Sequence, residues 1–279
     1  MSPRVTRRAV LAGLLVAAGP CTACAAPRAD PWPRWQASDE TARTRIDHAS
    51  WDRFLGRHLV AGEDGINRVA YGRVLPAERE ALAVYLAALA GLPVTTYRRA
   101  EQLAYWINLY NALTLRVVLD HYPVASIRDI ALSPGLLSRG PWRKKLLHIE
   151  GEEVSLDDIE HRILRPFWRD PRLHYVLNCA ALGCPNLQPR AFTAATTEEM
   201  LDDGARAYVN HPRGARLVDG GLHVSSIYVW YKVDFGGDDR GVIAHLHRYA
   251  GSPLAQALAS QTRIAGDSYD WSLNDAAVL

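Results

Sequence analysis

The sequence predicts an α+β fold, a helix-rich single domain with a small antiparallel sheet. About 250 residues follow the N-terminal segment, 48% of the chain is hydrophobic, and we find no repeat or low-complexity tract, as expected of one sizeable core. Apolar residues recur at helical spacing in the first half of the chain. After Pro141 this period gives way to short stretches that flank glycine turns.

Two helices are predicted in the first half. Residues 77–90 are strong helix formers, and Gly91 and Pro93 follow them as stop signals. A longer helix is predicted over residues 97–121. It ends before Pro123, because the residue that precedes a proline is disfavoured in the α conformation.

Two β-hairpins are predicted in the second half. Residues 145–155 turn at Glu150 and Gly151, and residues 215–229 turn at 219–221, which read Asp-Gly-Gly. Between them, Ser155 is placed to cap a helix that carries acids in its first turn. This helix is predicted to end at residue 164, before Pro166.

The first 25 residues have the composition of an export signal. Arg4, Arg7 and Arg8 precede an apolar run over residues 9–18 that is too short to span a bilayer. The paired arginines resemble a twin-arginine signal. We therefore expect an exported protein of the periplasm or cell envelope.

The cleavage point decides whether the mature protein is soluble or tethered. Residues 23–25 offer a small-x-small site, which gives a soluble product that begins near Ala26. Alternatively, residues 22–24 form a lipoprotein box in which Cys24 is acylated, and membrane contact is expected only through that anchor. Residues 26–40 are predicted to be a proline-rich linker, and residues 41–279 a single globular domain.

Charge and motifs exclude several function classes. Without Arg4, Arg7 and Arg8 the formal charge falls from +2 to −1, so a nucleic-acid partner is not expected. The chain has no Gly-x-Gly-x-x-Gly motif or phosphate loop, and we expect no cofactor. Neither Cys-x-x-Cys nor His-x-x-x-His spacing occurs near the candidate ligands, and we expect no metal site.

Outside the first 25 residues only Cys179 and Cys184 remain, and they are the main candidates for distinctive chemistry. A free thiol risks oxidation in an oxidising compartment, and a role of Cys179 as a nucleophile would be a reason to keep one. That compartment also favours a disulfide, which the spacing allows if the chain turns at Gly183. Inert buried thiols are the remaining alternative. These interpretations overlap, because an active-site pair can cycle between thiol and disulfide.

A nucleophilic Cys179 requires a base. His174 lies five residues before it, so the two side chains cannot meet on one regular element and a bend must separate them. His223, on the second predicted hairpin, is the better candidate, with Asp234 as a residue to orient it. The alternative for His223 is an exposed histidine on a strand, and the alternative for Asp234 is an acid that caps a turn.

Asn108 and Asn111 are carboxamides in an otherwise apolar helix. They either bind the backbone of neighbouring segments or supply a donor to a reacting oxygen. Asn178 is expected to pair with His174 across one helical turn. The remaining candidates to line a substrate pocket are aromatic, with a core position as the alternative for each: Trp106, Tyr110, Trp230 and Tyr231.

Three motifs in order resemble the domain-of-unknown-function family 547. They are residues 104–115, 170–185 and 225–235, and the resemblance covers residues 98–250. The family has no assigned activity. By analogy, the resemblance implies a core akin to papain-like or transglutaminase-like cysteine enzymes.

The leading hypothesis is an exported cysteine-dependent hydrolase or acyl-transfer enzyme that acts on an unidentified small molecule or peptide. Cys179 is its nucleophile, His223 or His174 its base, and Asp234 or Asn108 a supporting residue. The rival is a noncatalytic envelope domain with a structural disulfide and an aromatic binding cleft. A thiol-redox module is a third interpretation, which the spacing disfavours.

Overall fold

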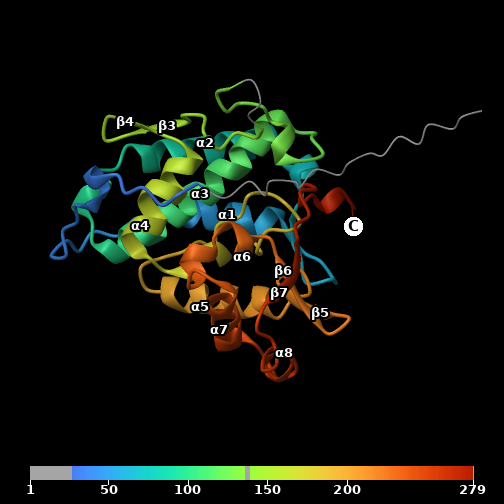
Figure 1. Ribbon diagram of the computed structural model, residues 1–279. Helices are drawn as coiled ribbons and strands as arrows, with labels where there is room; N and C mark the ends of the chain where they lie inside the picture. Colours follow the sequence, from blue (N-terminus) through green and yellow to red (C-terminus); the bar gives the residue numbers. More distant parts are fainter. Residues whose placement is uncertain (1–26, 136–138, 279) are drawn as a thin grey trace, which may run out of the picture.

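The computed structural model describes residues 27–135 and 139–278. The predicted export signal and the lipidation candidate Cys24 lie outside these residues. The chain forms the predicted α+β fold, in which helices predominate and the strands are short (Figure 1). No helix in the described part is long and apolar enough to cross a membrane.

A helical layer forms the upper part of the molecule in Figure 1, with α3 at its centre. Its small hairpins are antiparallel. The elements of this layer are α1 (Ala49–His58), β1 (Leu59–Ala61), β2 (Asn67–Val69), α2 (Pro76–Ala90), α3 (Arg99–His121), β3 (Leu147–Ile149), β4 (Glu152–Val154), the π-helix η5 (Asp158–Leu164) and α4 (Arg165–Trp168).

The second part of the molecule packs below this layer. Its sheet has the order β5-β6-β7, in which β5 and β6 are antiparallel and β6 and β7 are parallel. Its elements are α5 (Thr197–Val209), β5 (Ala215–Val218), β6 (Gly221–Ser225), α6 (Ile227–Trp230), α7 (Asp239–Tyr249), α8 (Ser252–Leu258) and β7 (Ile264–Ser268). Single 3-10 turns complete the chain at Pro33–Gln36, Tyr71–Arg73, Val94–Thr96, Ile127–Asp129, Pro171–Tyr175, Lys232–Phe235 and Ala276–Val278.

Most of the locally encoded elements lie where the sequence predicts them, with two corrections. The helix after Ser155 does not end at residue 164 but continues through Pro166 as α4, and residues 227–230, predicted as part of the second hairpin, form the helix α6. Helices α2 and α3 match the two predicted helices to within two residues, and α2 ends at Gly91. Both hairpins form. Glu150 and Gly151 have φ of 47° and 83°, and Asp219 and Gly220 have 50° and 78°, as tight two-residue hairpin turns require.

Two hydrophobic clusters make up the core. The larger surrounds α3, and the smaller lies between α5, the sheet and α7. Half-buried aromatic side chains of the two clusters meet where the clusters adjoin, and we call this boundary the seam. Trp142 and Trp271 belong to the larger cluster, and Trp230 and Tyr269 to the smaller. Ligand sites favour such boundaries between packed units, so the seam is the first place to seek function.

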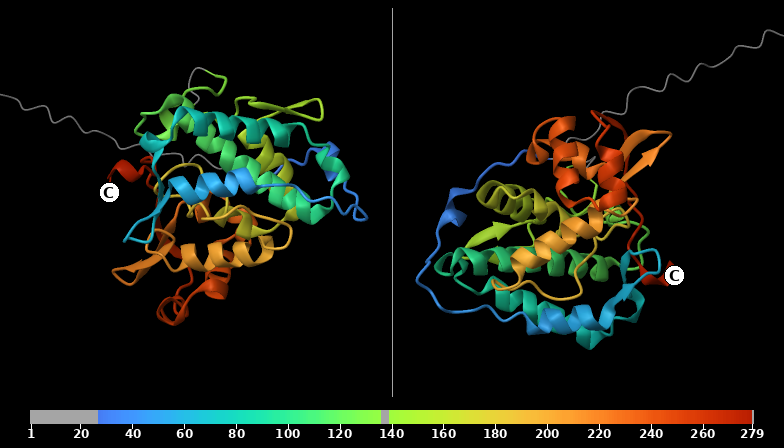
Figure 2. Two further views of the ribbon diagram at one scale, coloured as in Figure 1. Left: turned by 180° about the vertical axis from the view of Figure 1, so that it is seen from behind. Right: turned by 90° about the horizontal axis from the view of Figure 1, so that it is seen from below.

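The predicted linker is a docked part of the fold. Residues 27–36, here called the strap, run along the outside of the helical layer before α1 (Figure 2). The amides of Asp30 and Trp32 donate to the carbonyls of His161 and Arg162, each at 3.0 Å. Trp35 is only 1% exposed. Residues 27–36 of the predicted proline-rich linker are therefore packed against the helical layer.

Candidate functional site

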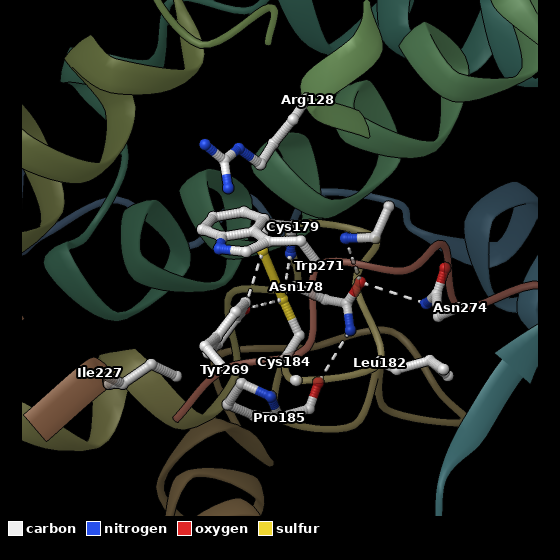
Figure 3. Close-up of a disulfide and its surroundings, with 12 residues drawn as sticks. Arg128, Asn178, Cys179, Leu182, Cys184, Pro185, Ile227, Tyr269, Trp271 and Asn274 are labelled. Carbon is white, nitrogen blue, oxygen red and sulfur yellow. Dashed lines mark hydrogen bonds between the residues drawn. A yellow bond between two sulfur atoms is a disulfide. The ribbon is translucent and has the colours of Figure 1, made fainter. Parts of the chain in front are cut away.

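Cys179 and Cys184 form a disulfide in the loop that follows the Pro171–Tyr175 turn (Figure 3). Their Cα atoms are 6.3 Å apart. Cys179 is half-buried, whereas Cys184 is 2% exposed. The loop needs glycine at position 183, because a Cβ there would lie 2.8 Å from the backbone nitrogen of Asp270.

The hydroxyl of Tyr269 lies against this disulfide. It is 3.1 Å from Sγ of Cys179 and 2.9 Å from Sγ of Cys184. Burial holds the pKa of Tyr269 well above its ordinary value, so the hydroxyl keeps its proton. Tyr269 is not among the site residues predicted from the sequence, because it lies far from the cysteines in the chain and no local motif marks it.

The segment around Tyr269 is held beside the disulfide loop by backbone hydrogen bonds. The amide of Leu182 donates to Ser272 at 2.8 Å, and the amide of Gly183 donates to Asp270 at 2.8 Å. This pairing continues to a bridge between Ala181 and Leu273. The C-terminal segment therefore forms one wall of the candidate site.

Four half-buried aromatic residues contact one another at the seam and reach the disulfide through Tyr269, and we call Trp142, Trp230, Tyr269 and Trp271 the aromatic patch. The Trp230 ring lies 4.9 Å from Tyr269 and 5.7 Å from Trp271, and Trp271 lies 5.8 Å from Trp142. The guanidinium of Arg128 sits 5.0 Å from the centre of the Trp271 ring. The patch thus combines apolar faces with a cation.

His174 pairs with Asp234 and not with a cysteine. Its Nε2 is 2.7 Å from Oδ2 of Asp234, and its ring stacks on Tyr231 at 4.1 Å. Arg165 Nε donates to the same oxygen at 2.6 Å. Desolvation alone would raise the pKa of Asp234, but the hydrogen bonds from His174 and Arg165 outweigh it and lower this pKa to about 2.

His223, the preferred candidate base, does not contact Cys179 either. It stands on β6 opposite Arg216, with its ring packed on Gly266 of β7. Within the described residues no hydrogen bond joins His223 or His174 to Cys179. The cysteine, histidine and aspartate residues that the sequence indicates are present, but in the structure they do not form a Cys-His-Asp triad.

Asn108 and Asn111 bind backbone outside their helix, as the first alternative predicted. Asn108 Nδ2 donates to the Phe192 carbonyl at 2.8 Å, and its Oδ1 accepts from the Phe192 amide at 2.9 Å. Asn111 donates to Val176 and accepts from the amide of Asn178. Both carboxamides are therefore occupied, which corrects the candidate roles of Asn108 as a donor to a reacting oxygen and of Asn111 as a substrate ligand.

Three further pocket candidates are core residues. Trp106 is fully buried, and the Tyr110 hydroxyl donates to Glu160 at 3.1 Å. Asn178 donates to the Pro185 carbonyl at 2.8 Å and does not pair with His174, because the helical turn ends at Tyr175. Of the predicted pocket residues, Trp230 lies at the seam, and the half-buried Tyr231 stacks on His174.

A cluster of buried charges lies behind His174 on the π-helix. The ring of His161 is 3.1 Å from Arg165, and Glu160 receives hydrogen bonds from Tyr110 and Tyr231. Burial raises the pKa of the neighbouring Asp157 to about 7, and repulsion from Glu160 adds to this. π-Helical turns are frequent at functional sites, and the acids of this helix were the sequence signal available.

A surface cavity of about 420 Å³ is lined by Lys232, Asp239 and their neighbours, and these two pair at 2.6 Å. In the parts of the chain that the structure covers, no three His, Cys, Asp or Glu side chains gather to hold a metal ion.

Comparison with known proteins gives one match. Residues 94–209 match the family described as "Protein of unknown function, DUF547", so the third motif, residues 225–235, lies beyond the matched segment. No curated protein and no solved structure matches the chain. A papain-like or transglutaminase-like core therefore stays a prediction. The matched segment holds α3, the π-helix and both cysteines, and this part of the chain belongs to the DUF547 family, as its motifs predicted.

Proposed function

We propose that the protein is an exported, noncatalytic binding domain of the cell envelope whose disulfide fixes a ligand surface at the seam. One observation carries this proposal. The half-buried sulfur of Cys179 is bonded to Cys184 and contacts the Tyr269 hydroxyl, whereas His174 is engaged by Asp234. A nucleophile needs a thiolate and a base in reach, and this arrangement supplies neither.

The aromatic patch is the binding surface of this proposal. Its four rings are half-buried, and they lie where the two hydrophobic clusters adjoin. Rigid aromatic side chains provide large contact areas at low entropic cost. With Arg128 beside Trp271, the patch suits a small molecule or peptide that presents an apolar face and an acceptor group.

A second candidate is a cysteine enzyme that is switched on by reduction. The exposure of the two sulfurs favours it, because Cys179 is half-buried and Cys184 is buried. An external dithiol would reduce the disulfide to two thiols and would itself become a disulfide. Cys179 could then act as a nucleophile once a base reached it.

Thiol labelling of the purified mature protein separates the two candidates. The binding domain should label with iodoacetamide at pH 6 at neither cysteine, and only denaturation with reductant should expose both. Rapid labelling of Cys179 after mild reduction of the folded protein, with Cys184 unreactive, would contradict the proposal and support the enzyme.

The binding surface is tested separately with the fluorescent apolar probe ANS. Wild-type protein should bind the probe, and Trp271→Ala should weaken this binding several-fold while the melting temperature changes little. Val84→Ala is a matched control, because Val84 is exposed and lies on α2. Equal probe binding by all three proteins would rule out the patch as a binding surface.

A further inference from the structure

The strap lies along the outside of the helical layer (Figure 2), and we call the surface that it covers the strap groove. This surface belongs to α3, the β3–β4 turn, the π-helix and α4. The side chains and carbonyls that receive the strap belong to Arg99, Trp106, Glu150, His161, Arg162 and Arg165.

A proline in the helix leaves two backbone carbonyls of the strap groove without a helical donor, and the strap binds to these carbonyls. In the π-helix the amide of Arg165 donates to Glu160, so the next carbonyl, that of His161, would need the amide of residue 166. Residue 166 is proline and has no N–H. In an α-helix, the amide of residue 166 would also donate to the carbonyl of Arg162. The Asp30 and Trp32 amides of the strap fill both vacancies at 3.0 Å.

Two tryptophans of the strap supply side-chain recognition. The Trp32 ring lies beneath the guanidinium of Arg162 at 4.5 Å and has the amine of Lys145 at 5.7 Å. Trp35 is 1% exposed and meets Trp106 edge to face at 5.2 Å. Tryptophans packed in this way are among the residues that contribute most to the affinity of interfaces.

Polar contacts hold the strap at both ends and fix its direction. Arg165 donates to the carbonyl of Pro27 at 2.7 Å, and Arg99 donates to that of Trp35 at 3.1 Å. Between them, Arg34 donates to the carbonyl of Glu150 at 2.6 Å. Prolines at 27, 31 and 33 restrict the free segment, so docking costs less conformational entropy.

We propose that the strap groove is a peptide-recognition site of the DUF547 domain for a proline-rich segment with two tryptophans three residues apart. The strap fills it within the same chain. All six receiving residues lie inside the family segment at 94–209, whereas the strap lies outside it. The groove is therefore built by the domain, and its occupant is supplied from elsewhere in the chain. This proposal does not depend on the aromatic patch.

The test uses the full mature chain with a protease site inserted between Ser38 and Asp39, in an exposed stretch. After cleavage of the folded protein, a fluorescein-labelled peptide of residues 27–36 is added. Its anisotropy should rise as it exchanges with the cut strap. A peptide that carries Trp32→Ala and Trp35→Ala should bind at least about tenfold more weakly.

A second variant tests the backbone recognition. Pro166→Ala restores a helical amide that competes for the His161 carbonyl, so peptide affinity should fall at least about threefold. Pro76→Ala is the matched control. Pro76 opens α2, where an N–H needs no helical partner. Unchanged affinity in Pro166→Ala would overturn the proposal, as would a cut chain that stays folded but does not bind the peptide, or one that unfolds on cleavage.

Discussion

The hydroxyl of Tyr269 lies 2.9 Å from Sγ of Cys184, although 85 positions separate the two residues. This contact joins the C-terminal segment to the disulfide loop. It also places a hydrogen-bond donor where a thiol enzyme would need a base. The noncatalytic interpretation of the seam depends on this relationship.

Tyr269→Phe keeps the ring in the aromatic patch and removes only the hydroxyl. We expect the free energy of unfolding to fall by about 1 kcal/mol, because the hydrogen bond that the single hydroxyl proton donates to the two sulfurs is lost. Urea denaturation measures the change. Tyr249→Phe is the control, since no hydrogen bond to that hydroxyl occurs within the described part of the chain. Equal stability of the two variants would mean that the sulfur contacts contribute nothing.

Cys179→Ala and Cys184→Ala should destabilise the fold equally, by about 2 kcal/mol each, because either change opens the same short loop. The double variant should cost no more than either single one. Chemical denaturation without reductant gives all three values. A Cys179→Ala protein as stable as wild type would show that the thiols are not joined in the mature protein.

Asn111→Ala should destabilise the protein by about 1 to 3 kcal/mol. The change leaves the Val176 carbonyl and the Asn178 amide without their buried partner. Asn111→Asp is the informative comparison, because it keeps the acceptor for Asn178 but loses the donor to Val176. Thermal melts should rank wild type above both variants. Melting temperatures that do not change would refute the structural role of this side chain.

Asp157 should make the fold less stable as the pH rises. Its pKa is raised from the ordinary 3.8 to about 7, so between these values the folded state binds more protons than the unfolded state. Stability therefore falls from about pH 4 to pH 7. Asp157→Asn should be more stable than wild type at pH 8, with the difference shrinking toward pH 4.

Urea titrations at pH 4.5, 6 and 8 measure this dependence. Asp203→Asn, a change on an exposed side of α5, is the control and should show no such trend. A constant difference between wild type and Asp157→Asn at all three pH values would argue against the raised pKa of Asp157.

Asp234 affects stability in the opposite sense. Its pKa is lowered to about 2, so its contribution to stability is present above pH 4 and is lost as the pH falls through 2.

The mature protein should lack residues up to about Ala25. Intact mass of protein recovered from the envelope fraction measures the cleavage point. A diacylglycerol mass on Cys24 would establish the lipid anchor. Recovery of a chain that retains Met1 would contradict the prediction of a cleaved signal.

The sequence predicted the elements whose signals are local. Helix α2 could be predicted from its helix formers and Gly91, and both hairpins from their turns. Asn108 and Asn111 were predicted to bind backbone because a carboxamide in an apolar helix must find a partner. These inferences needed no knowledge of distant contacts.

The remaining features depend on residues far apart in the chain. Arg165 and Asp234 are 69 positions apart, and nothing in either local pattern links them. The expected pair of His174 and Asn178 fails because the turn ends at Tyr175, one residue after the histidine. Trp35 looked like part of a spacer, since its proline-rich surroundings gave no sign of the pocket beside Trp106.

The docked strap also limits how far a tethered protein can move. Two residues separate Cys24 from Pro27, which Arg165 holds at the edge of the helical layer. A chain of that length reaches at most about 11 Å. A lipid on Cys24 would therefore hold the start of the strap within the headgroup region. The domain would keep one face toward the membrane, and any partner would have to approach from the remaining sides.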